Sequence, residues 1–438
     1  MSQRRRGIAT AGLAFGLGLA KSGWSQTTPA PAPAPAPAPP CPTLGLQGDI
    51  NLVGNSFPAL QHLARLAESC TRPGSKVRFK LTPEARVETE RAFDTPGTSP
   101  FDAAVVSMGV FSNLYSRRQL FDMSDLVTQY ANRYAIEERM LVRVDGAVMA
   151  IAFMQNTQNL VLRQDLFDRH HLAVPATYSD MLRAAATLKA REPDIVFPVA
   201  QAFGKGFDSA TEFTNLLASL GGRYFEPGTA RPAFQGDAGV QAIELMRSVL
   251  PFMTPNALAS NADDVMNQLQ QGKSAMGVLW ASRASRMDDP LASKVVGKMA
   301  FAAAPAARAG GPSAAHLWWD GVVMPRNAAS LSPARREATF LVLMEMLSAD
   351  AVRAGNDLAI WVRSAYRPGR FGVGVAAAQK AGAPVWPGEP FFSLAHAEIG
   401  KVLPDALKGD RTPRQVLDAA ALAYARSAAD KGFLKASS

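Results

Sequence analysis

The pattern of apolar and polar positions predicts strands alternating with helices over the first half of the chain. Short apolar runs predict strands over 49–53, 102–107 and 147–153, and apolar residues at every second position predict another over 77–81. Apolar residues in 60–67 recur at helical spacing. Strands that alternate with helices indicate an α/β fold with a largely parallel sheet.

Helical periodicity dominates the second half of the chain. Thr177 with Asp180 three residues later, and Thr412 followed by proline, are both typical helix starts. Helices are predicted over 177–188, 212–220, 237–250, 333–347, 391–407 and 412–432. Their apolar stripes indicate packed cores.

One stretch, 263–280, predicts a short helix followed at once by a buried strand. Asp263 is expected to cap the helix, Gly272 to end it, and Trp280 to stand at the strand's end. Ligands in open α/β sheets bind outside the carboxyl ends of strands. Trp280 taken alone is more often a core residue, but its position makes it a candidate for the site.

Two further stretches suggest a site. The polar run 155–159 directly follows a predicted strand, and is either a surface turn or a hydrogen-bonding wall where the chain crosses between domains. Trp318 and Trp319 are adjacent in a predicted extended segment, so their side chains point to opposite faces. One of the two can lie in a core while the other faces a cleft.

The N-terminus has the features of an exported protein. Residues 1–25 are predicted to be a signal peptide, with three arginines before an apolar run that is too short to span a membrane. The arginines resemble a twin-arginine signal, although the usual residues after them are missing. Residues 26–42 alternate proline with alanine and predict an extended linker, either a spacer or a leader without a role.

The chain has two cysteines, Cys41 and Cys70, both in the part predicted to be exported. In an oxidising compartment a lone pair of cysteines is more often a disulfide than two free thiols. We therefore predict a Cys41–Cys70 disulfide. The residues before Cys41 do not match a lipoprotein signal, so no lipid anchor is expected.

Composition and motifs exclude several functions. The chain has 438 residues, 47% of them hydrophobic, which is enough for two or three domains. Its net charge of +9 is spread along the sequence, so no nucleic acid partner is expected. The five histidines are scattered, and Gly272-Lys273-Ser274 lacks the strand and glycine that a phosphate-binding loop needs. We expect no enzyme activity, no cofactor and no metal site.

The order of these elements resembles the family 1 extracellular solute-binding proteins of ABC importers, the maltose-binding-protein-like group. The resemblance covers about 49–433. Four stretches carry the resemblance. Two are 101–106 and 409–413, and a third is Asp165-Leu166-Phe167 together with 172–180. The fourth is the predicted helix that is followed by Gly272-Lys273-Ser274-Ala275-Met276 and a strand. Tyr178 is a departure, since the family usually has tryptophan there.

The resemblance implies a two-lobed periplasmic-binding-protein fold, type II-like, with mainly parallel sheets flanked by helices and a ligand cleft between the lobes. Lobe 1 is expected over 43–153 plus 305–350, and lobe 2 over 154–304 plus 354–438. The family's properties further imply a monomeric periplasmic protein that works with the membrane subunits of an ABC permease.

The resemblance also implies ligand contacts, carried over by position. They are Asn55, Ser56, Ser107, Gln155, Asn156, Asp208, Thr211, Trp280, Trp318, Trp319, Asp320, Trp361 and Arg363. Aromatic faces and hydrogen-bonding side chains suit a sugar. The expected function is therefore capture of a carbohydrate-like solute by hinge closure and delivery to the permease.

Two other functions stay open. Asn156 stands where the maltose-type member has an acidic residue, and Arg363 is nearby, so a binding protein or sensory receptor for an organic anion, amine or other polar solute is the alternative. A secreted enzyme on the same fold is disfavoured because no catalytic constellation is found.

Overall fold

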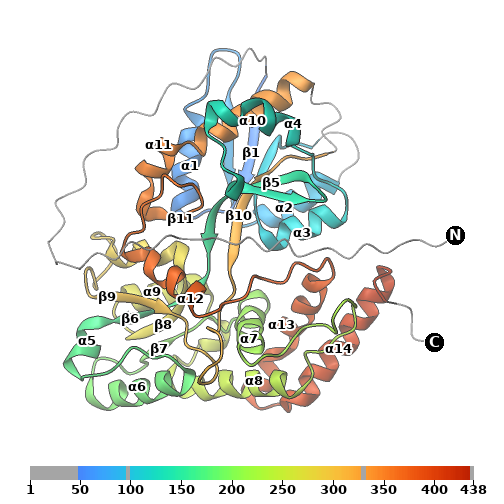
Figure 1. Ribbon diagram of the computed structural model, residues 1–438. Helices are drawn as coiled ribbons and strands as arrows, with labels where there is room; N and C mark the ends of the chain where they lie inside the picture. The colour runs from blue at the N-terminus through green and yellow to red at the C-terminus, as the bar shows by residue number, and fades with distance from the viewer. Residues whose placement is uncertain (1–47, 95–98, 327–331, 435–438) are drawn as a thin grey trace.

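The structure of the protein is a computed structural model that describes residues 48–94, 99–326 and 332–434 (Figure 1). Two α/β lobes lie one above the other, and the long strands β5 and β10 lead from the first toward the second. The predicted signal peptide, the predicted linker and Cys41 lie outside the described residues. The expected two-lobed fold is confirmed.

The sheet of the first lobe has the strand order β11-β5-β10-β3-β1-β2, with β4 also paired to β5. Its strands are β1 Ile50–Gly54, β2 Val77–Leu81, β3 Ala103–Ser107, β4 Leu141–Val144, β5 Ala147–Asn156, β10 Trp318–Val323 and β11 Ile360–Trp361. The helices of this part are α1 Pro58–Glu68, α2 Ala85–Asp94, α3 Met108–Ser116, α4 Ser124–Tyr134, α10 Pro333–Met346 and α11 Ala349–Ala354.

The sheet of the second lobe is smaller and has the order β7-β8-β6-β9. Its strands are β6 Gln158–Arg163, β7 Val199–Ala200, β8 Met276–Trp280 and β9 Met299–Ala303. The helices are α5 Gln164–Arg169, α6 Tyr178–Arg191, α7 Phe207–Ser219, α8 Asp237–Val249, α9 Ala262–Gln270, α12 Val373–Lys380, α13 Phe392–Lys408 and α14 Pro413–Asp430. Short 3-10 turns include η4 Ala281–Asp288, η5 Asn356–Leu358 and η6 Arg370–Gly372.

The expectation of mainly parallel sheets is wrong. Among the described strands, β1 pairs in parallel with β2 and β3, and β7 with β8, whereas the other pairs are antiparallel. The return of the chain from the second lobe accounts for two of the antiparallel pairs. Strand β10 enters the first sheet after that return and runs against both of its neighbours, β3 and β5.

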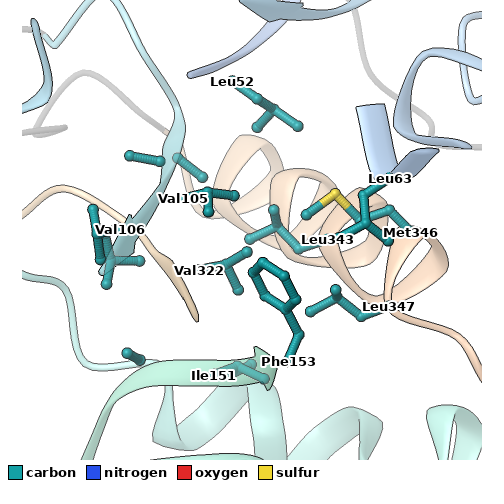
Figure 2. Close-up of a cluster of buried hydrophobic side chains, with 14 of the residues drawn as sticks. Leu52, Leu63, Val105, Val106, Ile151, Phe153, Val322, Leu343, Met346 and Leu347 are labelled. Carbon is teal, nitrogen blue, oxygen red and sulfur yellow. The ribbon is translucent and has the colours of Figure 1, made fainter. Parts of the chain in front are cut away.

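Each lobe has its own apolar core. In the first, Phe153 and Val322 point from the sheet toward Leu343 of α10 (Figure 2). In the second, the fully buried rings of Phe213 and Tyr424 lie among α7, α8, α13 and α14. Each such buried side chain contributes about 1.5–3 kcal/mol relative to an exposed one.

The cores put the lobe boundaries later in the chain than the sequence suggests. Ala307 and Ala314 pack in the second core, although lobe 1 was expected to resume at 305. Trp361 and Val362 pack in the first core, although lobe 2 was expected to resume at 354. The last two crossings therefore lie after Ala314 and after Val362.

Local signals at helix ends are mostly confirmed. Thr177 forms a capping box with Asp180, and Gly272 adopts the left-handed conformation, with φ of +67°, just after α9. Asp263 is not the cap of α9. Asn261 is, because its Oδ1 accepts the amide of Asp264 at 3.0 Å while Asp264 bonds back to the amide of Asn261.

Helix α7 begins at Phe207, five residues before the predicted start at 212. Gly206 precedes it with φ of +100°, a conformation that favours glycine. The earlier start brings Phe207 and Asp208 into the first helical turn.

Candidate functional site

Three tryptophans from distant parts of the chain meet where the lobes join. Trp280 ends β8, Trp318 begins β10, and Trp386 follows α12. The ring centroids of Trp318 and Trp386 are 4.0 Å apart, and those of Trp280 and Trp318 are 5.4 Å apart. Phe207 at the start of α7 adds a fourth ring, 6.3 Å from Trp318. We call these four residues the aromatic cluster.

A backbone contact holds Trp386 in place. Its amide donates to the carbonyl of Leu317 at 3.0 Å, and the amide of Leu317 donates to Pro384 at 2.7 Å. These two bonds form a bridge between the segment entering β10 and the segment leaving α12. The second crossing therefore connects directly to the segment that carries Trp386.

The aromatic cluster lies against the first lobe at α3. A Cβ built on Gly109 would lie 3.8 Å from Nε1 of Trp386 and 3.9 Å from the Trp318 ring. Gly388 similarly approaches Met108 and Ser112 of α3. Ser107, a predicted site residue, immediately precedes this helix. The cluster thus belongs to the junction of the two lobes.

Two carboxylates lie beside the cluster. Asp320 of β10 is paired in register with Ser107 of β3, and its carboxylate has no hydrogen-bond or ion-pair partner within the described part of the chain. Burial raises the pKa of Asp320 to about 7. Asp208 lies in the first turn of α7, and burial raises its pKa to about 6 against the opposing charge of Arg283. That arginine is itself engaged by Asp263 at 3.0 Å.

The amides of the first crossing bond to the second lobe. Nδ2 of Asn156 donates to Oγ of Ser282 at 3.2 Å, and its Oδ1 accepts the amide of Ser282. Gln155 accepts a hydrogen bond from Gln379 of α12 at 3.1 Å. The polar run is therefore a hydrogen-bonded seam at the crossing, the second of the two interpretations.

A network of buried polar side chains, connected by hydrogen bonds, lies next to the aromatic cluster. Gln158 donates to a carboxylate oxygen of Glu212 at 2.8 Å and accepts from Nδ2 of Asn215. Nδ1 of His316 donates to Oδ1 of Asn215 at 2.7 Å. We call these four residues the buried relay. Burial raises the pKa of Glu212 to about 8 and lowers that of His316 to about 3, so both are neutral at pH 7.

The buried relay connects the crossings to α7. Gln158 follows the first crossing, and the ring of His316 in the second packs edge-on against Trp386, with centroids 5.2 Å apart. Glu212 is one helical turn from Asp208 on α7. The relay therefore fixes the position of α7 relative to the aromatic cluster.

Three predicted site residues lie elsewhere. Trp319 packs edge-on against Phe111 in the first core, which confirms that the two adjacent tryptophans face opposite sides. Trp361 is buried in the same core, and its Nε1 donates to Gly355 at 2.8 Å. Arg363 donates to the carbonyls at the end of α4. These three side chains pack on or bond to the first lobe, and their role as ligand contacts stays a prediction.

The remaining predicted residues have mixed positions. Asn55 and Ser56 are exposed after β1, and the amide of Ser56 donates to Oδ1 of Asn55. Thr211 is buried and donates to the carbonyl of Phe207 at 2.8 Å, inside α7. The side chains of Asn55 and Ser56 are exposed but bonded locally, since Oγ of Ser56 also accepts from Gln61 at 3.2 Å. The hydroxyl of Thr211 is used by its own helix.

Sequence reasoning missed Phe207, Arg283 and Trp386. Phe207 was overlooked because α7 was predicted to begin later. Trp386 lies in the run Pro-Val-Trp-Pro-Gly, and a large aromatic residue between two prolines in a loop was a usable signal.

The site combines aromatic rings with two carboxylates that are close to them in sequence. Its three tryptophans are at most 9% exposed and pack against one another. In residues 48–94, 99–326 and 332–434, no group of three or more metal-ligating side chains comes together. None of the helices described there is long and apolar enough to cross a membrane.

Two α/β lobes with an aromatic site at their junction define a solute-binding protein of the two-lobed class. Residues 55–343 match the model of the bacterial extracellular solute-binding protein family. The chain belongs to this family.

Similar proteins were found among curated sequences. A probable amino-acid ABC transporter periplasmic-binding protein of Sinorhizobium fredii is 28% identical over 182 residues. The match covers 41% of this chain, and this chain spans 38% of the length of that relative.

Solved structures show the same fold over nearly their whole length. Maltose-bound MalE3 of T. maritima matches with a TM-score of 0.74 at 16% identity, over 86% of this chain and 99% of its own. Solute-binding proteins of ABC transporters from Agrobacterium vitis, with D-mannitol, and Agrobacterium radiobacter, with ribitol, give TM-scores of 0.73 and 0.72. Each is 18% identical; they cover 88% of this chain and 99% and 98% of their own.

Proposed function

We propose that this protein is the periplasmic component of an ABC importer that binds a sugar or polyol between its lobes and delivers it to the permease. The observation that carries the proposal is the aromatic cluster at the junction, flanked by Asp208 and Asp320. The family supports a solute-binding role, and the structural relatives named above hold maltose, mannitol and ribitol.

The chemistry of the junction supports this ligand class. A tryptophan face packs against the apolar C–H side of a sugar or polyol, while carboxylates accept hydrogen bonds from its hydroxyls. The ligand would contact residues of both lobes, so it would favour the conformation in which they are close. This is the physical basis of capture by hinge closure.

Export and oligomeric state belong to the same proposal. A signal peptide over 1–25 would place the mature protein in the periplasm, held by a Cys41–Cys70 disulfide and acting as a monomer. The ABC permease subunits would be its macromolecular partners, with no nucleic acid partner and no cofactor.

The ligand class is tested by a thermal-shift screen of the mature protein, followed by calorimetry on every compound that raises the melting temperature. A ligand that binds only the folded state must raise it. We expect shifts with sugars or polyols. Shifts with amino acids alone would instead support the function in the name of the Sinorhizobium relative, and would contradict the carbohydrate assignment.

The alternative of an anionic ligand has lost its main support. It was based on Asn156, which replaces an acidic residue, and on Arg363 nearby. The guanidinium of Arg363 donates to the carbonyls of Tyr134 and Ala135 at the end of α4. Organic acids stay in the screen as the comparison that tests this conclusion.

A further inference from the structure

The tryptophans of the aromatic cluster cover one another. Trp280, Trp318 and Trp386 are 9%, 8% and 3% exposed. The rings of Trp318 and Trp386 lie 4.0 Å apart at an interplanar angle of 31°, so each covers a face of the other. A sugar or polyol that packs on a tryptophan needs such a face at about 3.5–4.0 Å from its own carbon atoms. A solute that stacks on Trp318 must therefore displace a ring that is already there.

Of the three tryptophans, Trp386 is the one that can move. Trp280 and Trp318 belong to β8 and β10, where they are paired in register with β6 and β5. Trp386 lies instead in the segment 384–390 between α12 and α13, which we call the strap. Two backbone hydrogen bonds connect the strap to Leu317. Its three prolines have no N–H and cannot add a donor to this pairing.

The strap lies between helix α3 and solvent. Val385 is 53% exposed, so the outer side of the strap faces water. On the inner side, a Cβ built on Gly109 would lie 3.8 Å from Nε1 of Trp386, and one built on Gly388 would lie 3.9 Å from Cε of Met108. Helix α3 belongs to the first lobe, whereas the strap connects two helices of the second. Separation of the lobes therefore removes α3 from the strap.

We propose that Trp386 is a gate, which occupies the face of Trp318 on which a solute stacks and moves outward with the strap when the lobes separate. This inference rests on the proposed function, since it takes the aromatic cluster as the place where the solute binds. The solute and the indole of Trp386 compete for one face. A bound solute thus holds the gate open.

The gate lowers the affinity that the protein shows for its solute. The covering position of Trp386 is favoured by Phe392 and His396 of α13, whose ring centroids lie 5.2 and 5.4 Å from its own. Only the fraction of molecules with the gate open can bind, and the apparent affinity is reduced by that fraction. A smaller side chain in place of Trp386 should therefore tighten binding.

The first test removes the competing ring. Trp386→Leu keeps an apolar side chain and should bind at least about fivefold more tightly than the unchanged protein, because opening of the gate no longer limits affinity. D-mannitol, ribitol and maltose are the probes, and calorimetry measures their binding. Phe167→Leu removes a ring of α5 from the same core outside the aromatic cluster, and should leave affinity unchanged. Melting temperatures of both variants show that they are folded.

The second test needs neither a solute nor a variant. Trp386 and Trp361 are each 3% exposed, so their burial alone predicts equal oxidation by hydroxyl radicals. Since the gate opens in solution and Trp361 stays in the first core, Trp386 should be oxidised at least about fivefold faster. Mass spectrometry of the proteolysed protein measures both rates.

The outcomes separate this inference from the proposed function. Equal oxidation of the two tryptophans would overturn the gate, whichever solute binds. Unchanged affinity in Trp386→Leu would leave Trp386 a core residue, and weaker binding would make it a direct contact. Either result overturns the gate while the solute-binding function stands. If neither protein binds any sugar or polyol of the screen, the carbohydrate function is overturned, and the gate with it.

Discussion

At the scale of single residues, neighbours in sequence serve different parts of the molecule. Trp318 joins the aromatic cluster at the junction, whereas Trp319 packs on Phe111 in the first core. The alternation of a strand is enough to separate them. A substitution in the aromatic cluster should therefore affect binding, whereas a substitution of Trp319 should affect stability.

Trp280→Phe should weaken ligand binding at least tenfold, about 1.4 kcal/mol. The smaller ring loses part of the face presented next to Trp318. Calorimetry with the best ligand from the screen measures the change.

Trp319→Phe is the control for Trp280→Phe. It should lower the melting temperature by enlarging a space in the first core and leave affinity unchanged. Equal affinities of Trp280→Phe and the unchanged protein would show that Trp280 has only a structural role.

Glu212→Gln should change how stability depends on pH. Burial raises the pKa of Glu212 to about 8 in the folded protein, above the 4.5 of an unshifted glutamate. The folded state therefore holds a proton that the unfolded state releases between those values. The unchanged protein loses stability as pH rises through this window, by up to about 1.4 kcal/mol per pH unit.

The variant lacks this titration but keeps an acceptor for Gln158. Its stability relative to the unchanged protein should therefore rise from pH 5 to pH 8 and then level off. Urea unfolding at several pH values measures the difference. A difference that stays constant with pH would show that Glu212 ionises normally in the fold.

At the scale of elements, the ends of helices and strands decide where the site is. Helix α7 carries Phe207 and Asp208 in its first turn, and the buried relay fixes the helix through Glu212 and Asn215. Helix α4 ends at Ala135, in a left-handed conformation, under the guanidinium of Arg363. Helix α7 thus presents site residues, while the end of α4 explains the structural role of Arg363.

Arg363→Met should lower the free energy of unfolding by about 1.5–3 kcal/mol, because the variant leaves the last carbonyls of α4 without their charged donor. Urea unfolding provides the measurement. Arg426→Met, which removes an exposed arginine of α14, should change stability by less than about 0.5 kcal/mol.

Ligand affinity should be the same for both arginine variants and the unchanged protein. A selective loss of acidic ligands in Arg363→Met would restore the organic-anion alternative.

Periodicity predicted most elements correctly, and its failures have physical causes. The strand at 49–53 was found because its short apolar run is buried on both faces, and the helix at 60–67 because a single buried face determines its pattern. The start of α7 was missed because the buried positions of this helix lie all around it, so no stripe marks its first turn. Trp280 and Trp318 could be identified from strand ends, whereas Trp386 depends on a bridge to Leu317 that local sequence does not encode.

At the scale of the whole molecule, the lobes are joined by three crossings, and the tryptophans of the aromatic cluster pack in the second core. A motion of one lobe relative to the other would therefore move α3 of the first lobe against the cluster. The segment before α1 is expected to be tied down by the Cys41–Cys70 disulfide, with Cys70 buried beside α1.

The mature protein, purified without reductant, should show no reactive thiol after unfolding. Cys70→Ser should lower the free energy of unfolding by about 2–4 kcal/mol, the usual effect of losing a disulfide. Thiol titration in urea and chemical unfolding measure the two quantities. Two thiols per chain in the unfolded protein would refute the bridge.

The position of β10 has a consequence for how the chain acquires its structure. This strand fills the middle of the first sheet, between β3 and β5, yet it is made only after the whole sheet of the second lobe. A nascent chain that ends before residue 318 has β1 to β5 but lacks both the central strand β10 and the edge strand β11. Such long-range pairing is slow to form, so folding of the first lobe should wait for the second half of the chain.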